Sequence, residues 1–168
     1  MRFVLIDRLL ELEAGRRIVA CKTFAAEEEF LKDHFPGFPV IPGALLTEVM
    51  VQTGGWLILR TLDFARWPFL CMIEKAKFRR FVKPGENLVI EANLCSTQGD
   101  NFEVQAVARV SQNQVAQSRI VYHAPAGLAS TDVQLQLETW ARETFASLGG
   151  HLALTQSEET LREGKKFE

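Results

Sequence analysis

The sequence predicts an α+β fold in which a curved antiparallel sheet wraps around one long central helix. Residues 42–61 lack strand alternation, have the length of a helix and are apolar on nearly every face, so this helix needs to be enclosed. Alternating segments joined by short polar links stand on both sides of it. The 168 residues, 47% of them hydrophobic and 24% charged, suffice for one domain with a core.

The elements before the helix are short. Residues 2–12 and 18–24 are rich in Val, Leu and Ile and flank a polar turn, so they predict a pair of strands. Residues 27–32 predict one or two helical turns. Three prolines between 36 and 42 prevent a regular helix until Pro42, which suits the start of one.

Four further strands follow the helix. Short links of turn-forming residues separate them, which predicts an antiparallel meander of sequential neighbours. The expected strands cover residues 69–82, 88–97, 102–110 and 114–123.

The chain changes character after Pro125. We expect residues 1–125 to form the sheet-and-helix domain and residues 126–168 to form a C-terminal extension. A rough apolar stripe over 132–148 predicts a helix in this extension, and the polar residues 157–168 predict a frayed end.

Composition excludes several classes of protein. The net charge of −2 argues against a nucleic-acid binder. Cys21, Cys71 and Cys95 form no CxxC pair, so we expect buried thiols in a reducing cytoplasm, with no zinc site and no disulfide framework. Glu48 and Gln52 interrupt the longest apolar run, which argues against a membrane span.

Ionisable residues in apolar sequence mark the candidate site. Glu48 and Gln52 are four residues apart and therefore share one face of the predicted helix. His34 lies on the proline-rich loop just ahead, and a histidine with a desolvated glutamate forms a general acid–base pair. Gly43 at the helix start offers backbone N–H groups that can polarise a carbonyl. The combination suits proton transfer beside a thioester or ketone.

Each of these residues also has an ordinary structural explanation. A histidine in a loop is commonly exposed, and a glutamate in an apolar helix is commonly paired or at an interface. Taken one at a time, His34 and Glu48 therefore leave the question of catalysis open.

The whole stretch resembles the signature of the hotdog-fold 3-hydroxyacyl-[acyl-carrier-protein] dehydratases of the FabZ type. The match comprises His34-Phe35-Pro36-Gly37, Pro39, Pro42-Gly43, Glu48, Gln52 and Gly54-Gly55. Residues 4–22 and 74–94 are similar to two further segments of the family, so the resemblance covers roughly residues 3–123.

The resemblance implies a role for each matched residue. His34 would take the proton alpha to the thioester, Glu48 would assist departure of the 3-hydroxyl, and the Gly43 N–H would bind the thioester carbonyl. Gln52 would hold Glu48 in place. The expected lining of the acyl tunnel includes Phe35, Val40, Phe69 and Phe81.

The family also implies how the chain works with partners. Its members use no metal and no organic cofactor, and they act on substrates carried by acyl carrier protein. The base of one chain meets the acid of another, so a homodimer is expected, with further assembly into a trimer of dimers as one option. Glutamate at position 48, where the dehydratase–isomerase branch has aspartate, favours dehydration without isomerisation. The tail from Ala126 has no counterpart in typical members, which suggests a specialised pathway.

Two other functions share this fold. A hotdog thioesterase would release free acid, and a non-catalytic partner subunit would bind acyl chains without turnover. The intact pair of His34 and Glu48 favours the dehydratase.

A cluster of basic residues offers a docking surface. An acidic carrier protein would be attracted to it, although charged residues on a solvated strand face would give the same pattern. The cluster consists of Lys75, Lys77, Arg79, Arg80 and Lys83.

Overall fold

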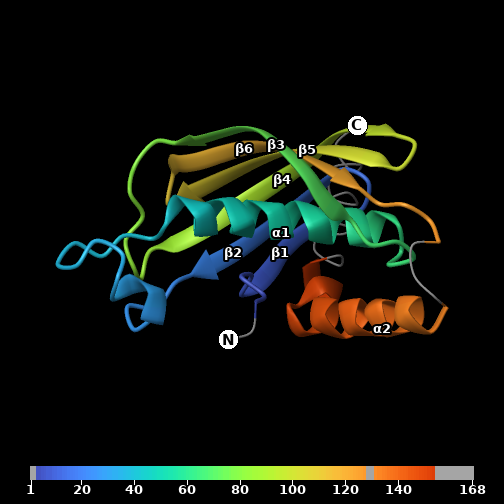
Figure 1. Cartoon of the computed structure of the whole chain (residues 1–168), viewed down its shortest axis with the longest axis horizontal. Coiled ribbons are helices and arrows are strands. Elements are labelled where there is room, and N and C mark those ends of the chain that lie inside the picture. Colours follow the sequence, from blue (N-terminus) through green and yellow to red (C-terminus); the bar gives the residue numbers. More distant parts are fainter. Residues whose placement is uncertain (1–2, 128–130, 154–168) are drawn as a thin grey trace, which may run out of the picture.

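A computed structural model describes residues 3–127 and 131–153 (Figure 1). It contains one six-stranded antiparallel sheet that curves around a long helix, and a second helix lies beside the first (Figure 1). This confirms the predicted architecture. The elements are β1 Arg8–Glu13, β2 Arg17–Thr23, the 3-10 helix η1 Glu29–Leu31, α1 Gly43–Thr61, β3 Phe69–Phe78, β4 Asn87–Gln98, β5 Asn101–Val110, β6 Asn113–His123 and α2 Thr131–Ser147.

The concave face of the sheet packs on α1. On β5, Phe102, Val104, Ala106 and Ala108 are buried while the residues between them are not, which is the period-two pattern of a strand with one covered face. From α1, the side chains of residues 49–51 and 56–59 fill the core from the other side. The expectation of an enclosed helix is therefore confirmed.

The predicted meander is wrong at its first strand. The strand order is β1-β2-β4-β5-β6-β3, so β3 pairs with β6 at the edge and is not a neighbour of β4. Three strand spacings, about 14 Å, separate β3 from β4. Residues 79–86 make this crossing, and eight residues can reach about 26 Å. Strand β3 therefore ends at Phe78 and not at residue 82.

Two backbone hydrogen bonds fix the crossing segment. Ile41 N donates to Val82 O over 2.8 Å, and Gly85 N donates to Phe24 O over 2.9 Å. The first bond joins the segment directly to the residue before Pro42, which precedes α1 as its N-cap. The crossing segment is thus bonded directly to the residues that lead into α1.

The middle of α1 is locked to the sheet by a buried tyrosine. The Tyr122 hydroxyl donates to the backbone oxygen of Val51 over 2.6 Å. Burial, and secondarily the negative charge of Glu48, raise the pKa of Tyr122 far above its usual range. The phenol therefore remains a neutral hydrogen-bond donor, close enough to Glu48 to sense its charge.

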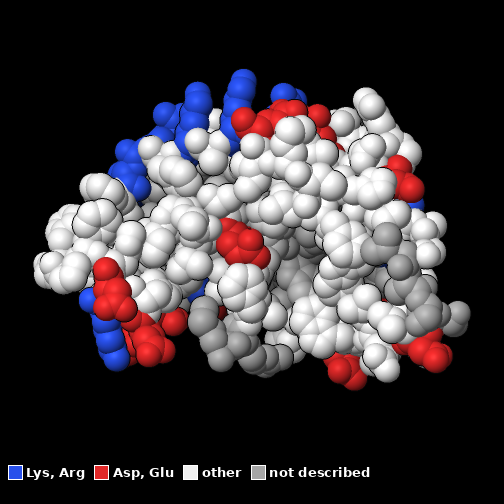
Figure 2. All heavy atoms as spheres, viewed as in Figure 1, with Lys and Arg blue, Asp and Glu red and all other residues white. Residues whose placement is uncertain are grey.

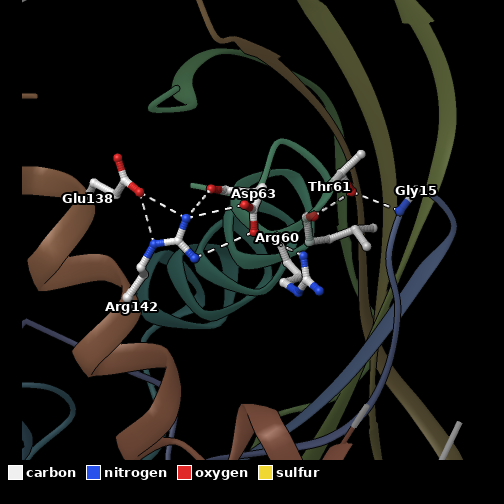
Figure 3. A network of polar contacts seen from close by, with 7 residues as sticks. Gly15, Arg60, Thr61, Asp63, Glu138 and Arg142 are labelled. Atoms are coloured by element: carbon white, nitrogen blue, oxygen red, sulfur yellow. Dashed lines mark hydrogen bonds and ion pairs between the residues drawn. The ribbon is translucent and has the colours of Figure 1, made fainter. Parts of the chain in front are cut away.

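Helix α2 confirms the predicted helical extension. Arg142 donates to the backbone oxygen of Asp63 over 2.8 Å, to the Asp63 carboxylate at 3.3 Å and to Glu138 at 2.9 Å (Figure 3). The Arg142 guanidinium also lies 4.8 Å from the ring centroid of Phe64. These contacts attach α2 to the turn that follows α1. The predicted frayed end, 157–168, lies outside the described residues.

The thiols are more exposed than expected. Cys71 and Cys95 are exposed and Cys21 is half-buried, and all three are free. Cys71 lies on the edge strand β3, and Cys95 falls where the register between β4 and β5 shifts, so neither faces α1. No helix within the described parts of the chain is long and apolar enough to cross a membrane.

Candidate active site

Glu48 is held by a glutamine one turn further along α1. The Nε2 atom of Gln52 donates to Glu48 Oε1 over 2.9 Å. The same amide donates to Phe3 O at 3.1 Å and accepts from Leu5 N at 2.7 Å. Both ends of the Gln52 amide are thus engaged, which fixes its orientation toward the half-buried carboxylate.

Glu48 and Gln52 line a cavity of about 250 Å³. Apart from these two residues its walls are mostly apolar, and Figure 2 shows an acidic patch beside a hollow in otherwise uncharged surface. A carboxylate at such a position borders an apolar space while it is oriented by a hydrogen bond. The walls include Val51, Gly55, Trp56, Leu59, Tyr122 and Trp140.

His34 lies in a second pocket, of about 260 Å³. Its loop turns sharply because Phe35 and Gly37 have φ angles of 53° and 83°, in the left-handed region. The bond from Phe38 N to Phe35 O, at 2.9 Å, closes this turn. The imidazole packs against the edge of the Phe35 ring, with centroids 4.7 Å apart.

Gly43 shares the pocket of His34. It is the first residue of α1, where backbone N–H groups point out of the helix. A Cβ at this position would lie 3.4 Å from the ring of Phe78, so glycine keeps this space open. The predicted tunnel residues Phe35, Val40 and Phe81 line the same pocket.

The two pockets have no lining residue in common. One holds the candidate base and the candidate carbonyl binder, and the other holds the candidate acid. Strand β3 reaches both, since it gives Phe78 to the pocket of His34 and Leu70 to the cavity of Glu48. All ten residues of β3 are exposed, so this edge of the sheet is available to a second chain.

Phe69 stands apart from both pockets. It is the first residue of β3, is 41% exposed and pairs with His123 of β6. It lines a different, smaller cavity of about 40 Å³ together with Trp67 and residues of α2. The described chain therefore does not bring Phe69 together with the other predicted tunnel residues.

The five predicted docking residues cluster at one edge. Lys75 and Lys77 lie on β3, and Arg79, Arg80 and Lys83 follow it on the crossing segment. Figure 2 shows Lys and Arg side chains gathered along the edge where Figure 1 places β3 and β6. Arg80 differs from its neighbours because it forms two bonds to Glu86, at 2.9 and 3.1 Å.

The pair of Arg80 and Glu86 predicts an acid-sensitive crossing segment. The hydrogen bond from Arg80, with one from the Lys83 backbone, lowers the pKa of Glu86. A carboxyl whose pKa is lower in the folded state stabilises the fold above its unfolded pKa, and this contribution disappears as the pH falls through the folded value. We expect Glu86→Gln to reduce the free energy of unfolding more at about pH 6 than at about pH 3, because the benefit of the ionised carboxylate declines as the pH falls. Urea titrations at both pH values measure this; an equal loss at both would contradict it.

Several cavity residues were not predicted from the sequence. Trp67, Tyr122 and Trp140 all border the cavity of Glu48, and they come from three separate segments. Trp140 stood in the predicted stripe of the C-terminal helix, but nothing in a single helix indicates which surface its stripe will cover.

Metal ligands are not clustered in the described parts of the chain. No group of three or more His, Cys, Asp or Glu side chains lies close enough there to hold a metal ion. The described site residues are a histidine, an oriented carboxylate and a helix start, which are candidate groups for proton transfer.

A curved sheet around a long helix, with a half-buried carboxylate on that helix and a histidine on the loop before it, defines a hotdog-fold protein with a candidate acid–base site. The sequence model of the FabA-like domain family matches residues 1–124 of this chain. The chain therefore belongs to this family.

Within this family, the chain is similar to proteins named as FabZ dehydratases. The chain is 39% identical over 121 residues to the 3-hydroxyacyl-[acyl-carrier-protein] dehydratase FabZ of Pelotomaculum thermopropionicum, covering 71% of this chain and 86% of that protein. It is 40% identical over 121 residues to the FabZ of Desulforamulus reducens, covering 71% and 85%.

Solved structures agree on the fold alone. A chain of the dehydratase heterocomplex ApeI:P from Xenorhabdus doucetiae is similar with a TM-score of 0.55 and 18% identity, covering 67% of this chain and 92% of that one. A thioesterase of Haemophilus influenzae gives a TM-score of 0.58 and 15% identity, covering 73% and 80%.

Proposed function

We propose that this protein dehydrates 3-hydroxyacyl thioesters carried by acyl carrier protein to trans-2-enoyl thioesters. The observation that carries the proposal is the oriented carboxylate of Glu48 in an apolar cavity, with His34 and Gly43 in the neighbouring pocket. Membership of the FabA-like family and relatives named as such dehydratases support it.

Each step assigns one group to one task. The neutral imidazole of His34 takes the proton from the carbon alpha to the thioester, and the Gly43 N–H donates to the carbonyl oxygen as negative charge develops there. The electron pair of the broken C–H bond forms the double bond as the C–O bond at carbon 3 breaks. Glu48 enters this step as a neutral carboxylic acid and gives its proton to the departing hydroxyl, so the products are the enoyl thioester, water and a Glu48 carboxylate.

The site is shared between two chains in this proposal. Support comes from the separation of the two pockets and from β3, an exposed edge strand that borders both. Pairing through this strand would place His34 of one chain near Glu48 of another, as a two-fold homodimer. A trimer of dimers is a further step of the same proposal.

We also propose a cytoplasmic location for the protein. Its three free thiols suit a reducing compartment.

Product analysis tests the function. The purified protein is given a short-chain 3-hydroxyacyl carrier protein, and mass spectrometry follows the acyl group. We expect loss of one water with the thioester intact. Free 3-hydroxy acid would identify a thioesterase, and an unchanged substrate would identify a non-catalytic partner subunit; either result would overturn the proposal.

Charge reversal tests the docking surface. We expect Arg79→Glu or Lys83→Glu to raise the KM for carrier-protein substrates by about tenfold, because an acidic partner loses attraction at the rim of the site. Turnover of a small acyl-cysteamine thioester should not change. The matched control is Arg16→Glu, since Arg16 is an exposed arginine next to β2, toward the opposite edge of the sheet. An equal loss on both substrates would show that these residues do not dock the carrier.

A further inference from the structure

Helix α2 contributes to the cavity of Glu48 although it lies beyond residues 1–124, which the family model matches. We propose that Trp140 of α2 forms the end wall of the acyl site and thereby limits the length of the acyl chain. This inference rests on the proposed function, because it assigns the specificity of that same site.

The cavity follows one face of α1. Glu48, Gln52, Gly55 and Leu59 line it at intervals of three or four residues, as residues on one helical face do. With a rise of 1.5 Å per residue, the cavity extends about 16 Å along the helix from Glu48 to Leu59. An acyl chain whose reacting end lies at Glu48 would therefore point its tail toward Leu59.

Trp140 stands beside the half of this path that is farther from Glu48. Its ring stacks on that of Trp56, with centroids 6.1 Å apart and an interplanar angle of 22°. Its centroid is also 5.6 Å from that of Trp67, in the segment that leads into β3. Trp56 is eight residues beyond Glu48, so the stacked indoles lie more than two turns of helix away from the acid.

The part of α2 that carries Trp140 is anchored to α1 and to the turn that follows it. The ring of Phe145, five residues further along α2, packs on Trp56 at 6.3 Å and on Phe64 at 5.4 Å. The bonds of Arg142 to Asp63 anchor the same part of α2 to the end of α1 (Figure 3). The wall is therefore a fixed part of the fold, and yet Trp140 itself is 43% exposed and does not fill the core.

The residues that line the cavity indicate which kind of acyl tail it can hold. Of the residues that line the cavity only Glu48 is charged, and the end beyond Gln52 is aromatic and aliphatic. The tail that fits is a hydrocarbon without a terminal charge. Each methylene buried there contributes roughly 0.8 kcal/mol, or about a fourfold gain in kcat/KM, until the chain meets Trp140.

The experiment measures kcat/KM for 3-hydroxyacyl carrier proteins of increasing acyl length. For the wild type we expect a rise with length followed by a sharp fall. Trp140→Ala should move the optimum to chains longer by about two carbons or more, and Trp140→Phe should move it less. The matched control is Leu135→Ala, which removes another exposed apolar side chain of α2 that lines none of the described pockets.

An unchanged length optimum in a folded Trp140→Ala protein would overturn the inference, and so would a shift of equal size in Leu135→Ala. If circular dichroism shows that Trp140→Ala is unfolded, the length optimum of Trp140→Phe is used instead, and an unchanged optimum in that variant would overturn the inference. Binding of saturated acyl-pantetheine amides, measured by calorimetry across the length series, needs no dehydration. A wild type that produces no enoyl thioester would thus refute the proposed function, while the binding series would still test the wall.

Discussion

His34→Ala and Glu48→Gln should each lower kcat for enoyl formation by about 10²- to 10⁴-fold. The first change removes the base that takes the alpha proton. The second keeps the size of the side chain and its capacity to bond Gln52 but removes the acidic proton that leaves with the hydroxyl. The rate of enoyl formation by mass spectrometry measures both losses. Variants that turn over like the wild type would refute the assignment.

A matched control separates these losses from general damage. His123 lies at the end of β6, where its Nδ1 atom is 2.8 Å from Asn101 Oδ1, and it lines none of the pockets described above. His123→Gln should therefore keep most of the activity, and all three variants should keep the wild-type circular dichroism spectrum.

Mixing the two inactive variants tests whether the site is shared. If each site takes His34 from one chain and Glu48 from the other, a mixed dimer contains one intact site. Random pairing of co-expressed His34→Ala and Glu48→Gln chains should then restore about a quarter of the wild-type activity. Co-expression of two differently tagged His34→Ala chains should restore none. Absence of recovery in purified mixed dimers would place the acid and the base within one chain.

Gly54→Ala should reduce the free energy of unfolding by about 2–4 kcal/mol. A Cβ at this position would lie 2.5 Å from the Tyr122 hydroxyl and 3.2 Å from Val104 Cγ1. The tyrosine could move only by losing its bond to Val51 O, which would leave a buried polar pair unsatisfied. Urea titration with a fluorescence readout measures the change.

The next residue in the chain provides the control. In the same helix, a Cβ at Gly55 would meet only Pro68 Cγ, at 4.0 Å. Alanine is a better helix former than glycine, so Gly55→Ala should leave stability unchanged or raise it by about 0.5–1 kcal/mol. Equal destabilisation by the two changes would contradict the account of Tyr122 as the lock between α1 and the sheet.

The strands were predicted from periodicity, but the position of β3 was not. Alternation in 101–110 reports which residues of a strand are buried, and the structure confirms it. Pairing depends on where the chain goes between strands, and the short link after β3 suggested a neighbouring strand. Instead, residues 79–86 run over the end of the sheet, held by bonds to Phe24 and Ile41 that are distant in sequence. Long-range bonds of this kind leave no periodic signal.

The polar residues of the candidate site could be predicted from the sequence more easily than the residues that line its cavity. His34, Gly43, Glu48 and Gln52 lie within nineteen consecutive residues, so spacing alone relates them. The structure places Gly43 with His34 and Gln52 with Glu48. Trp140 comes from a helix almost a hundred residues away, and the bonds of Gln52 to Phe3 and Leu5 join segments that no local pattern connects.

If the site is shared through the exposed edge strand β3, the rate of catalysis depends on how much of the protein is dimeric. Each chain alone would hold half of two different sites and an open edge that carries apolar side chains. Below the dissociation constant of the dimer, activity would fall with the square of the chain concentration. The folded state would also become harder to melt as the protein is concentrated, because association stabilises only the folded chain. A change in the cellular amount of this protein would then change the reaction rate by more than the same factor.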